Sequence, residues 1–206
     1  MAPFSIVYHE GYLTPYYTST VECPERVKAV YSKLRDRFPV IKPETAELED
    51  IYRVHSRAMV ERVILEGRDT YQTALLAVGG AITASEEAAK GIPALALVRP
   101  PGHHAGPERY WGYCFFNNIA VAIAKLMVKG SIASALVLDL DLHHGDGTEN
   151  IFKDSQAVTV VNIRGKTRKA YLDSLEQELE NFSELDLLAL SAGQGGGYHQ
   201  GEGQAV

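Results

Sequence analysis

The stretch from Ala135 to Gly147, ALVLDLDLHHGDG, limits the folds open to this chain more than any other segment. It begins with an apolar run of the kind that forms a buried strand in an α/β sheet. Acidic and imidazole side chains follow at Asp139, Asp141, His143, His144 and Asp146. Open α/β sheets bind their ligands at the C-terminal ends of the strands. The segment therefore predicts a strand that ends in a polar site.

Asp141 and His143 are two positions apart. On an extended backbone their side chains point to the same side and can share a metal ion. Carboxylates carried by a buried strand are costly to desolvate without a cation, which favours a metal site. The alternative is a polar loop that caps the next helix, with Asp146 helping to start that helix.

Apolar strand patterns alternate with helical ones along the whole chain. Strands are predicted at residues 5–8, 94–98, 135–141, 157–163 and 185–191, and helices at 24–34, 57–65, 71–90, 117–128, 147–152 and 169–182. This alternation favours a mainly parallel sheet with helices on both faces. A length of 206 residues suits one such domain, so we expect a single α/β, three-layer αβα domain over 1–206. Residues 193–206 form a glycine-rich tail, a composition typical of a flexible terminus.

The composition limits the binding partners and the cellular compartment that we expect for this protein. The net charge of −6 gives no electrostatic support for nucleic-acid binding. The apolar runs are too short for a membrane span, and the first residues lack the pattern of a secretory signal. Cys23 and Cys114 are too few for a disulfide framework. We therefore expect a cytoplasmic protein that binds neither nucleic acid nor membrane.

A second cluster lies at residues 99–118, RPPGHHAGPERYWGYCFFNN. His103 and His104 are adjacent, so both cannot pack into an apolar core. Imidazoles titrate near neutral pH and therefore suit general acid–base catalysis beside a metal. A carboxylate that accepts a hydrogen bond from one ring nitrogen fixes the tautomer of the imidazole. Asp139 and Asp146 are available for that role. Together, two such clusters at strand ends predict a hydrolytic metal site.

These segments also resemble a known family. RPPGHHA, GYCFFNN and DLDLHHGDGT occur in this order and are similar to the motifs of the histone deacetylase superfamily, which includes acetoin-utilisation proteins and acetylpolyamine amidohydrolases. CPERVKAV, at residues 23–30, resembles the family's His-Pro-Glu-Arg segment, with Cys23 in place of the histidine. The resemblance covers about residues 5–193 and implies the arginase–deacetylase fold.

The resemblance implies a zinc site. Asp141 and His143 match two of the family's three zinc ligands, although another divalent metal is an alternative. Asp139 matches a residue that also helps to bind a monovalent cation in relatives. Asn162 stands where that second site has a serine, which is a departure from the pattern.

The resemblance also assigns acid–base roles. His103 and His104 match the tandem histidines, with His104 as the general base that takes a proton from water. Asp139 and Asp146 match their carboxylate partners. His144 is expected either to support the metal ligands from behind or to have a structural part.

The implied substrate is an acylated amine. The Gly112 carbonyl is expected to accept the amide N–H, and Tyr113 to form the aromatic wall of the acyl tunnel. Tyr198 follows three glycines, as does the tyrosine that stabilises the oxyanion in relatives.

The third zinc ligand is missing from its usual place. Residues 191–193, Ser-Ala-Gly, match the family's Ser-Ala-Gly-Phe-Asp segment, but Gln194 and Gly195 follow, so the aspartate is absent. One hypothesis is a deletion, after which Tyr198 keeps its role and His199 or Glu202 replaces the ligand. A second is a truncated end with an impaired site. A third is that a partner chain, as in a homo-oligomer, supplies the ligand.

The sequence thus favours zinc-dependent hydrolysis of an acyl amide, from acetyl-lysine, an acetylpolyamine or a related small amide. The main alternative is a catalytically impaired deacetylase-like scaffold that has kept the pocket. A ureohydrolase with two manganese ions is disfavoured, because the further aspartates it needs after Ser191 are missing.

Overall fold

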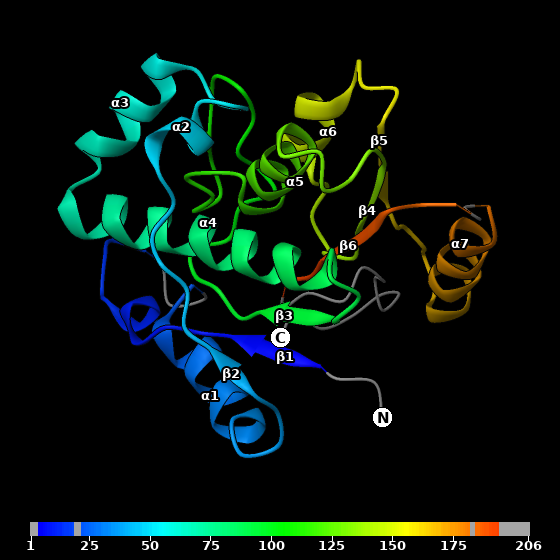
Figure 1. Cartoon of the computed structure of the whole chain (residues 1–206), viewed down its shortest axis with the longest axis horizontal. Coiled ribbons are helices and arrows are strands. Elements are labelled where there is room, and N and C mark those ends of the chain that lie inside the picture. The colour runs from blue at the N-terminus through cyan, green and yellow to red at the C-terminus, as the bar shows by residue number, and fades with distance from the viewer. Residues whose placement is uncertain (1–3, 19–21, 182–183, 194–206) are drawn as a thin grey trace.

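A computed structural model describes residues 4–18, 22–181 and 184–193 of the chain. Helices and short parallel strands alternate through these residues (Figure 1). In chain order they are β1 Ser5–Val7, the 3-10 helix η1 Glu10–Leu13, α1 Pro24–Leu34, β2 Val40–Ile41, α2 Leu48–Ile51, α3 Arg57–Leu65, α4 Arg68–Ala88, β3 Ala94–Ala96, α5 Asn118–Val128, β4 Ala135–Asp139, α6 Asp146–Phe152, β5 Val158–Asn162, α7 Arg168–Glu180 and β6 Leu187–Ser191.

All the strand pairs between these elements are parallel, as the alternating pattern predicts. The strands form two three-stranded sheets, with the orders β2-β1-β3 and β5-β4-β6. In the second sheet β4 is the central strand, and Asp139 lies in register with Asn162 of β5 and Ser191 of β6. The C-terminal ends of these strands therefore meet at one edge.

Helices cover both faces of β4. Ala135 and Val137 belong to an apolar cluster with α5, whereas Leu136 and Leu138 belong to a cluster packed against α7. This division follows from the period of two along a strand, which turns successive side chains to opposite faces. The result is the expected three-layer αβα arrangement, with α5 and α7 as the outer layers around β4 (Figure 1).

The first sheet lies between α1 and α4. Ile6 of β1, Val27 of α1 and Leu76 of α4 share one apolar cluster, and α4 passes between this sheet and α5 (Figure 1). The middle of α4, residues 73–82, is buried throughout, which explains its small and apolar sequence. The helix is therefore a central support on which both halves of the molecule pack.

Three short elements, η1, β2 and α2, were not expected from the sequence. They span only four, two and four residues, so they are too short to show a hydrophobic period. The strands predicted at 94–98 and 135–141 are shorter than expected, since β3 ends at Ala96 and β4 at Asp139. After Asp139, Leu140 N–H still donates to the Ser191 carbonyl, and the Asp141 N–H donates to the Asp139 carboxylate instead of to a neighbouring strand.

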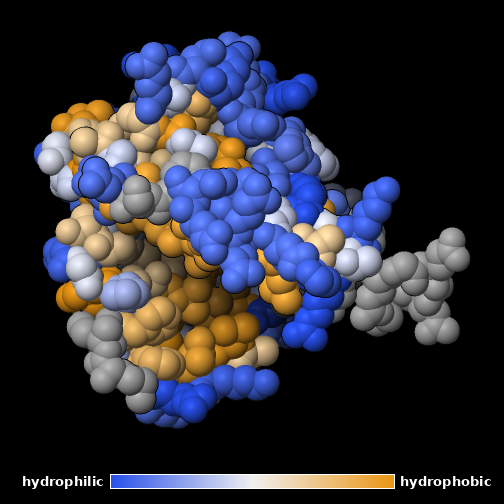
Figure 2. All heavy atoms as spheres, turned by 90° about the vertical axis from the view of Figure 1, so that its right-hand side faces the viewer, coloured by the Kyte–Doolittle hydropathy of each residue, from blue (hydrophilic) through white to orange (hydrophobic). Residues whose placement is uncertain are grey.

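Strand β6 is an edge of its sheet within the described part of the chain. Its Leu188 and Leu190 are 46% and 57% exposed. The face that Figure 2 turns to the reader, on the side of the molecule that carries α7, has a hollow in which apolar residues gather. Among the described residues, no helix has both the length and the apolar content that crossing a bilayer requires.

Candidate active site

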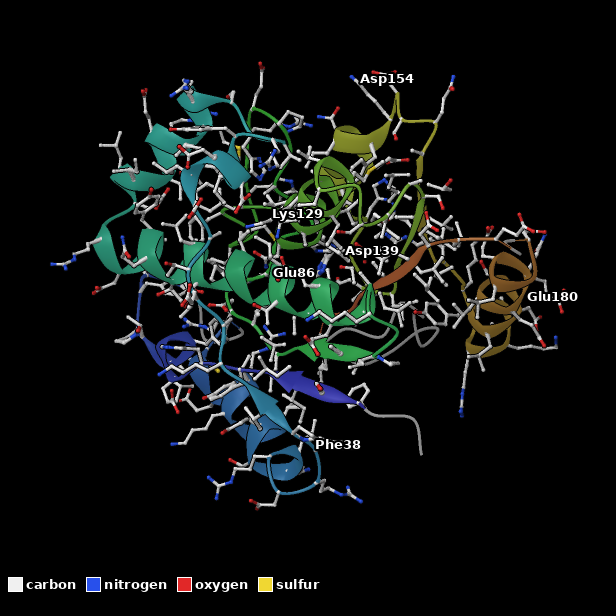
Figure 3. The ribbon with its side chains drawn as sticks, viewed as in Figure 1. Phe38, Glu86, Lys129, Asp139, Asp154 and Glu180 are labelled. Atoms are coloured by element: carbon white, nitrogen blue, oxygen red, sulfur yellow. The ribbon has the colours of Figure 1, made fainter. Side chains whose placement is uncertain are left out.

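The polar residues that follow β3 and β4 come together at the C-terminal edge of the second sheet. Asp139, the last residue of β4, is fully buried, and Figure 3 shows it in the middle of the molecule, whereas Asp154 and Glu180 lie at the outside. The loop that carries His103 and His104 runs from β3 to α5 and lies against the start of α6, since Thr148 N–H donates to the His103 carbonyl at 3.1 Å. Residues more than thirty positions apart thus share one site.

His103 is paired with Asp139. Its Nδ1 lies 2.9 Å from Asp139 Oδ2, and its side chain is only 10% exposed. Burial by itself lowers the pKa of an imidazole, but the hydrogen bond to Asp139 and the nearby charges of Asp139, Asp141 and Asp146 outweigh it, so the pKa of His103 is raised. The His103 ring therefore retains a proton more readily than a free histidine does.

His104 is paired with Asp146. Its Nδ1 lies 2.7 Å from Asp146 Oδ1. Burial lowers the pKa of His104, and although Asp146 opposes this effect, the pKa stays below its ordinary value. The pKa of the Asp146 carboxyl is also lowered, since burial raises it but the hydrogen bonds from His104 and Trp111 prevail. The two histidines therefore have opposite shifts, which suit different roles.

Trp111 is a neighbour that sequence reasoning missed. Its ring stacks on His104 with centroids 3.7 Å apart, and its Nε1 donates to Asp146 Oδ2 at 3.1 Å. It contacts both members of one pair while remaining 50% exposed. The only signal in the sequence is its position directly before the GYCFFNN motif.

Gly112 and Tyr113 form a turn beside His104. Both have positive φ values, 59° and 62°. A Cβ on Gly112 would lie 2.7 Å from His104 Cδ2, so only glycine lets the backbone approach the ring this closely. The turn therefore brings a main-chain segment beside the imidazole, where both residues were expected to contact the substrate.

Asp141 and His143 also lie together. Asp141 Oδ1 is 3.2 Å from His143 Nδ1 and accepts the His143 backbone N–H at 2.7 Å. The sequence argument placed both on an extended strand, and this was wrong, because β4 ends at Asp139. Their proximity comes from a carboxylate-capped turn.

The surroundings of Asp141 are crowded. A Cβ on Gly193, after β6, would lie 1.6 Å from Asp141 Oδ2, so the end of β6 packs directly on this carboxylate. On the other side, Arg164 Nη1 donates to the Asp141 carbonyl at 2.8 Å. Sequence reasoning did not find Arg164, which belongs to none of the motifs.

The donor types fit zinc, since carboxylate oxygen and imidazole nitrogen are common zinc ligands. Asp141 Oδ1 and His143 Nδ1 lie 3.2 Å apart. However, the described residues contain no group of three or more histidine, cysteine or acidic side chains placed to hold a metal.

The remaining candidates lie elsewhere. His144 is half exposed, and its Nε2 lies 2.7 Å from Glu149 Oε2, outside the two histidine pairs. Tyr198 lies outside the described residues, as do Gln194, His199 and Glu202. The oxyanion donor and the replacement ligand therefore stay predictions.

Three comparisons relate this chain to known proteins. A family model described as the histone deacetylase domain matches residues 20–181. A probable deacetylase of Methanothermobacter thermautotrophicus is 37% identical over 182 residues, which are 79% of this chain and 52% of that protein. An acetylpolyamine amidohydrolase of Mycoplana ramosa is 42% identical over 103 residues, which are 50% of this chain and 30% of that protein.

The fold has a solved counterpart. The crystal structure of the HDA15 HD domain superposes with a TM-score of 0.69 and 26% identity, over 77% of this chain and 52% of that one. The match supports the expected three-layer αβα architecture with parallel strands. The chain spans about half the length of the curated relatives it matches.

Proposed function

We propose that this chain, which belongs to the histone deacetylase family, hydrolyses an acyl amide with the help of a zinc ion. The observation that carries the proposal is the convergence of two histidine–carboxylate pairs with the Asp141–His143 pair at one sheet edge. A hydrolase that acts on amides needs a base, an acid and an electrophile close together. The first two are supplied by the histidine pairs.

Asp141 and His143 would hold the metal, with a third ligand from outside the described residues. Zinc, when bound, supplies Lewis acidity that polarises the acyl carbonyl and activates water. Gly193 allows the end of β6 to lie against the carboxylate and so restricts its rotation.

His104 is the general base of this proposal. Because its pKa is lowered, the ring is neutral at pH 7 and can accept a proton at Nε2. Asp146 holds the other nitrogen, Nδ1, so the free nitrogen faces away from the carboxylate. Trp111 covers one ring face and limits the access of water to it.

His103 is the complementary acid. Asp139 stabilises its protonated form, so the ring can return a proton to the leaving amine. The turn at Gly112 and Tyr113 offers a main-chain carbonyl for the amide N–H beside these rings. The substrate class is an acylated amine, either acetyl-lysine, an acetylpolyamine or a related small amide.

A non-catalytic scaffold is the alternative, favoured by a specific observation. Within the described ranges, only a pair of metal-type donors is found at the site, whereas catalytic zinc usually has three protein ligands. Such a protein would bind an acylated amine without turning it over.

Zinc content and turnover decide between these functions. We expect purified protein to hold near-stoichiometric zinc and to hydrolyse a fluorogenic acetyl-lysine amide or an N-acetylated diamine. Asp141→Ala should lose the metal, and His104→Ala should keep it while turnover falls about 100-fold or more. The exposed His144→Ala is the matched control and should change neither. Protein that stays metal-free after incubation with zinc would support the scaffold instead.

A further inference from the structure

A buried histidine outside the site holds the loop that carries His103 and His104. His55, between α2 and α3, is 3% exposed. Its Nδ1 lies 2.8 Å from the Gly106 carbonyl oxygen, and its Nε2 accepts the Asn117 backbone N–H at 2.9 Å. Both ring nitrogens are therefore used by main-chain groups of one loop.

The two bonds hold the two ends of residues 106–117, which form the second half of that loop. Gly106 follows the tandem histidines by two positions, and Asn117 is the N-cap of α5. The intervening residues include Trp111, which contacts His104 and Asp146. A side chain that fixes both ends of this segment also fixes what lies between them.

Asn117 extends the same network toward α6. Its Nδ2 donates to the Ala105 carbonyl at 3.0 Å and to Thr148 Oγ1 at 3.0 Å, and its Oδ1 caps α5 through Ala120 N–H. Thr148 is in the helix that begins with Asp146, the partner of His104. The loop is thus bonded to the element that carries the carboxylate of the pair.

The ring of His55 is neutral in this environment. Burial lowers its pKa to about 4, although the bond to Gly106 acts in the opposite direction. A neutral ring has one N–H and one lone pair, which match one carbonyl and one N–H. A charged ring would have two donors and could not accept from Asn117.

We propose that His55 is a positioning residue, which fixes the His104–Asp146 pair by bonding both ends of residues 106–117, the segment that carries Trp111. The expected loss of turnover rests on the proposed function. The expected loosening of the loop does not. A histidine that served only the stability of the core would be replaceable by a ring of similar shape, since His55 also contacts Phe116 with centroids 5.7 Å apart.

Trp111 is the only tryptophan of the chain, so its fluorescence reports this loop alone. His55→Phe keeps a ring and removes both bonds. We expect changed tryptophan emission and at least a twofold rise in quenching by acrylamide, with the far-ultraviolet circular dichroism unchanged. kcat should fall at least tenfold, with KM and zinc content changing less than twofold.

His55→Gln retains one donor and one acceptor and should restore native quenching and most of kcat. Val158→Ala, in β5 and away from the loop, is the control for lost stability and should leave the quenching native. If His55→Phe does not fold, His55→Asn, which is too short to make both bonds, takes its place with the same expectations.

Native quenching and kcat in a folded His55→Phe or His55→Asn protein would overturn the proposal, as would equal changes in Val158→Ala. If the wild-type protein shows no turnover, the proposed function fails, while the fluorescence comparison still decides the role of His55.

Discussion

At the scale of single residues, the Asp141–His143 pair depends on the absence of a side chain at Gly193. The motif argument did not identify this steric requirement. Gly193 lies against Asp141 so closely that a methyl group would overlap Oδ2. The carboxylate is held on its other oxygen by the His143 N–H. A side chain at position 193 must therefore displace the carboxylate and disturb its bond to the His143 N–H.

We expect Gly193→Ala to weaken zinc binding about 10-fold or more, as disturbing the neighbours of a ligand generally does. Competition with a chromogenic chelator measures this. The control is Gly130→Ala, where φ is 69° and no atom lies within 4 Å of the new methyl group. That change should lower stability through backbone strain and leave zinc affinity alone; equal affinity losses in both variants would contradict the explanation.

Titration of His55 makes stability depend on pH. Its pKa is about 4 in the folded protein, below the ordinary value of 6.5, so the unfolded chain binds more protons between these pH values. Stability from this group is therefore fully present above pH 6.5 and is lost as the pH falls toward 4. The full effect is about 3 kcal/mol.

Urea unfolding at a series of pH values between 4 and 7 measures this dependence. In His55→Gln the side chain does not titrate, so the slope of unfolding free energy against pH should be smaller than in the wild type. Equal slopes in the two proteins would contradict the buried neutral state of His55.

At the scale of elements, the long helix α4 is fitted to its neighbours by glycine. A Cβ on Gly79 would lie 1.8 Å from the Glu44 carbonyl oxygen, which is main chain and cannot rotate away. At an exposed position of a helix, a change from glycine to alanine raises the free energy of unfolding by about 1 kcal/mol. Here the overlap should exceed that gain, because overpacking a core costs about 1–3 kcal/mol.

We therefore expect Gly79→Ala to be destabilising, by about 1–2 kcal/mol, in thermal or urea unfolding. Gln72→Ala, at an exposed position of the same helix, should be close to neutral. A Gly79→Ala protein more stable than the wild type would show that residues 40–48 yield to the helix.

The longer elements were predictable because each has enough residues to repeat its pattern. The expected helix at 57–65 matches α3, and the pattern at 169–182 differs from α7 by one residue at the start and two at the end. The expected start of the helix at 71–90 was wrong, since α4 begins at Arg68 with Gly67 as its N-cap. No apolar residue marks that first turn, so the hydrophobic period contained no information about it.

At the scale of the whole molecule, a buried ion pair links the N-terminal segment to the histidine loop. Arg99 Nε lies 2.8 Å from Glu22 Oε1, and both side chains are almost fully buried. Arg99 Nη1 also donates to the carbonyls of Tyr12 and Thr14. Arg99 leads directly into the PPGHH segment, so this pair connects η1 and the chain before α1 to the loop that carries His103 and His104.

Arg99→Met should destabilise the protein by about 3–5 kcal/mol, because Glu22 is left as an uncompensated buried charge. Glu22→Gln should cost less, since Arg99 keeps its carbonyl partners. In a double-mutant cycle by urea unfolding, the double variant should be less destabilised than the sum of the single ones. Additive losses would mean that the two side chains do not act as a pair.

The motifs of this sequence determined the family and the candidate site residues. RPPGHHA, GYCFFNN and DLDLHHGDGT fixed the identity of the candidate acids, bases and ligands, because side-chain type is local information. The alternation of strand and helix patterns likewise determined the αβα layers, since a period of two or 3.6 residues fixes which faces are buried.

Only the tertiary structure decided which side chains touch. His103 is paired with Asp139 and His104 with Asp146, while Trp111 covers the second pair. The contact between Asp141 and His143 comes from a capped turn and not from the strand. His55 bonds a loop that begins more than forty positions away. Such contacts depend on how parallel strands and their loops meet at one edge, and no local period in the sequence contains that information.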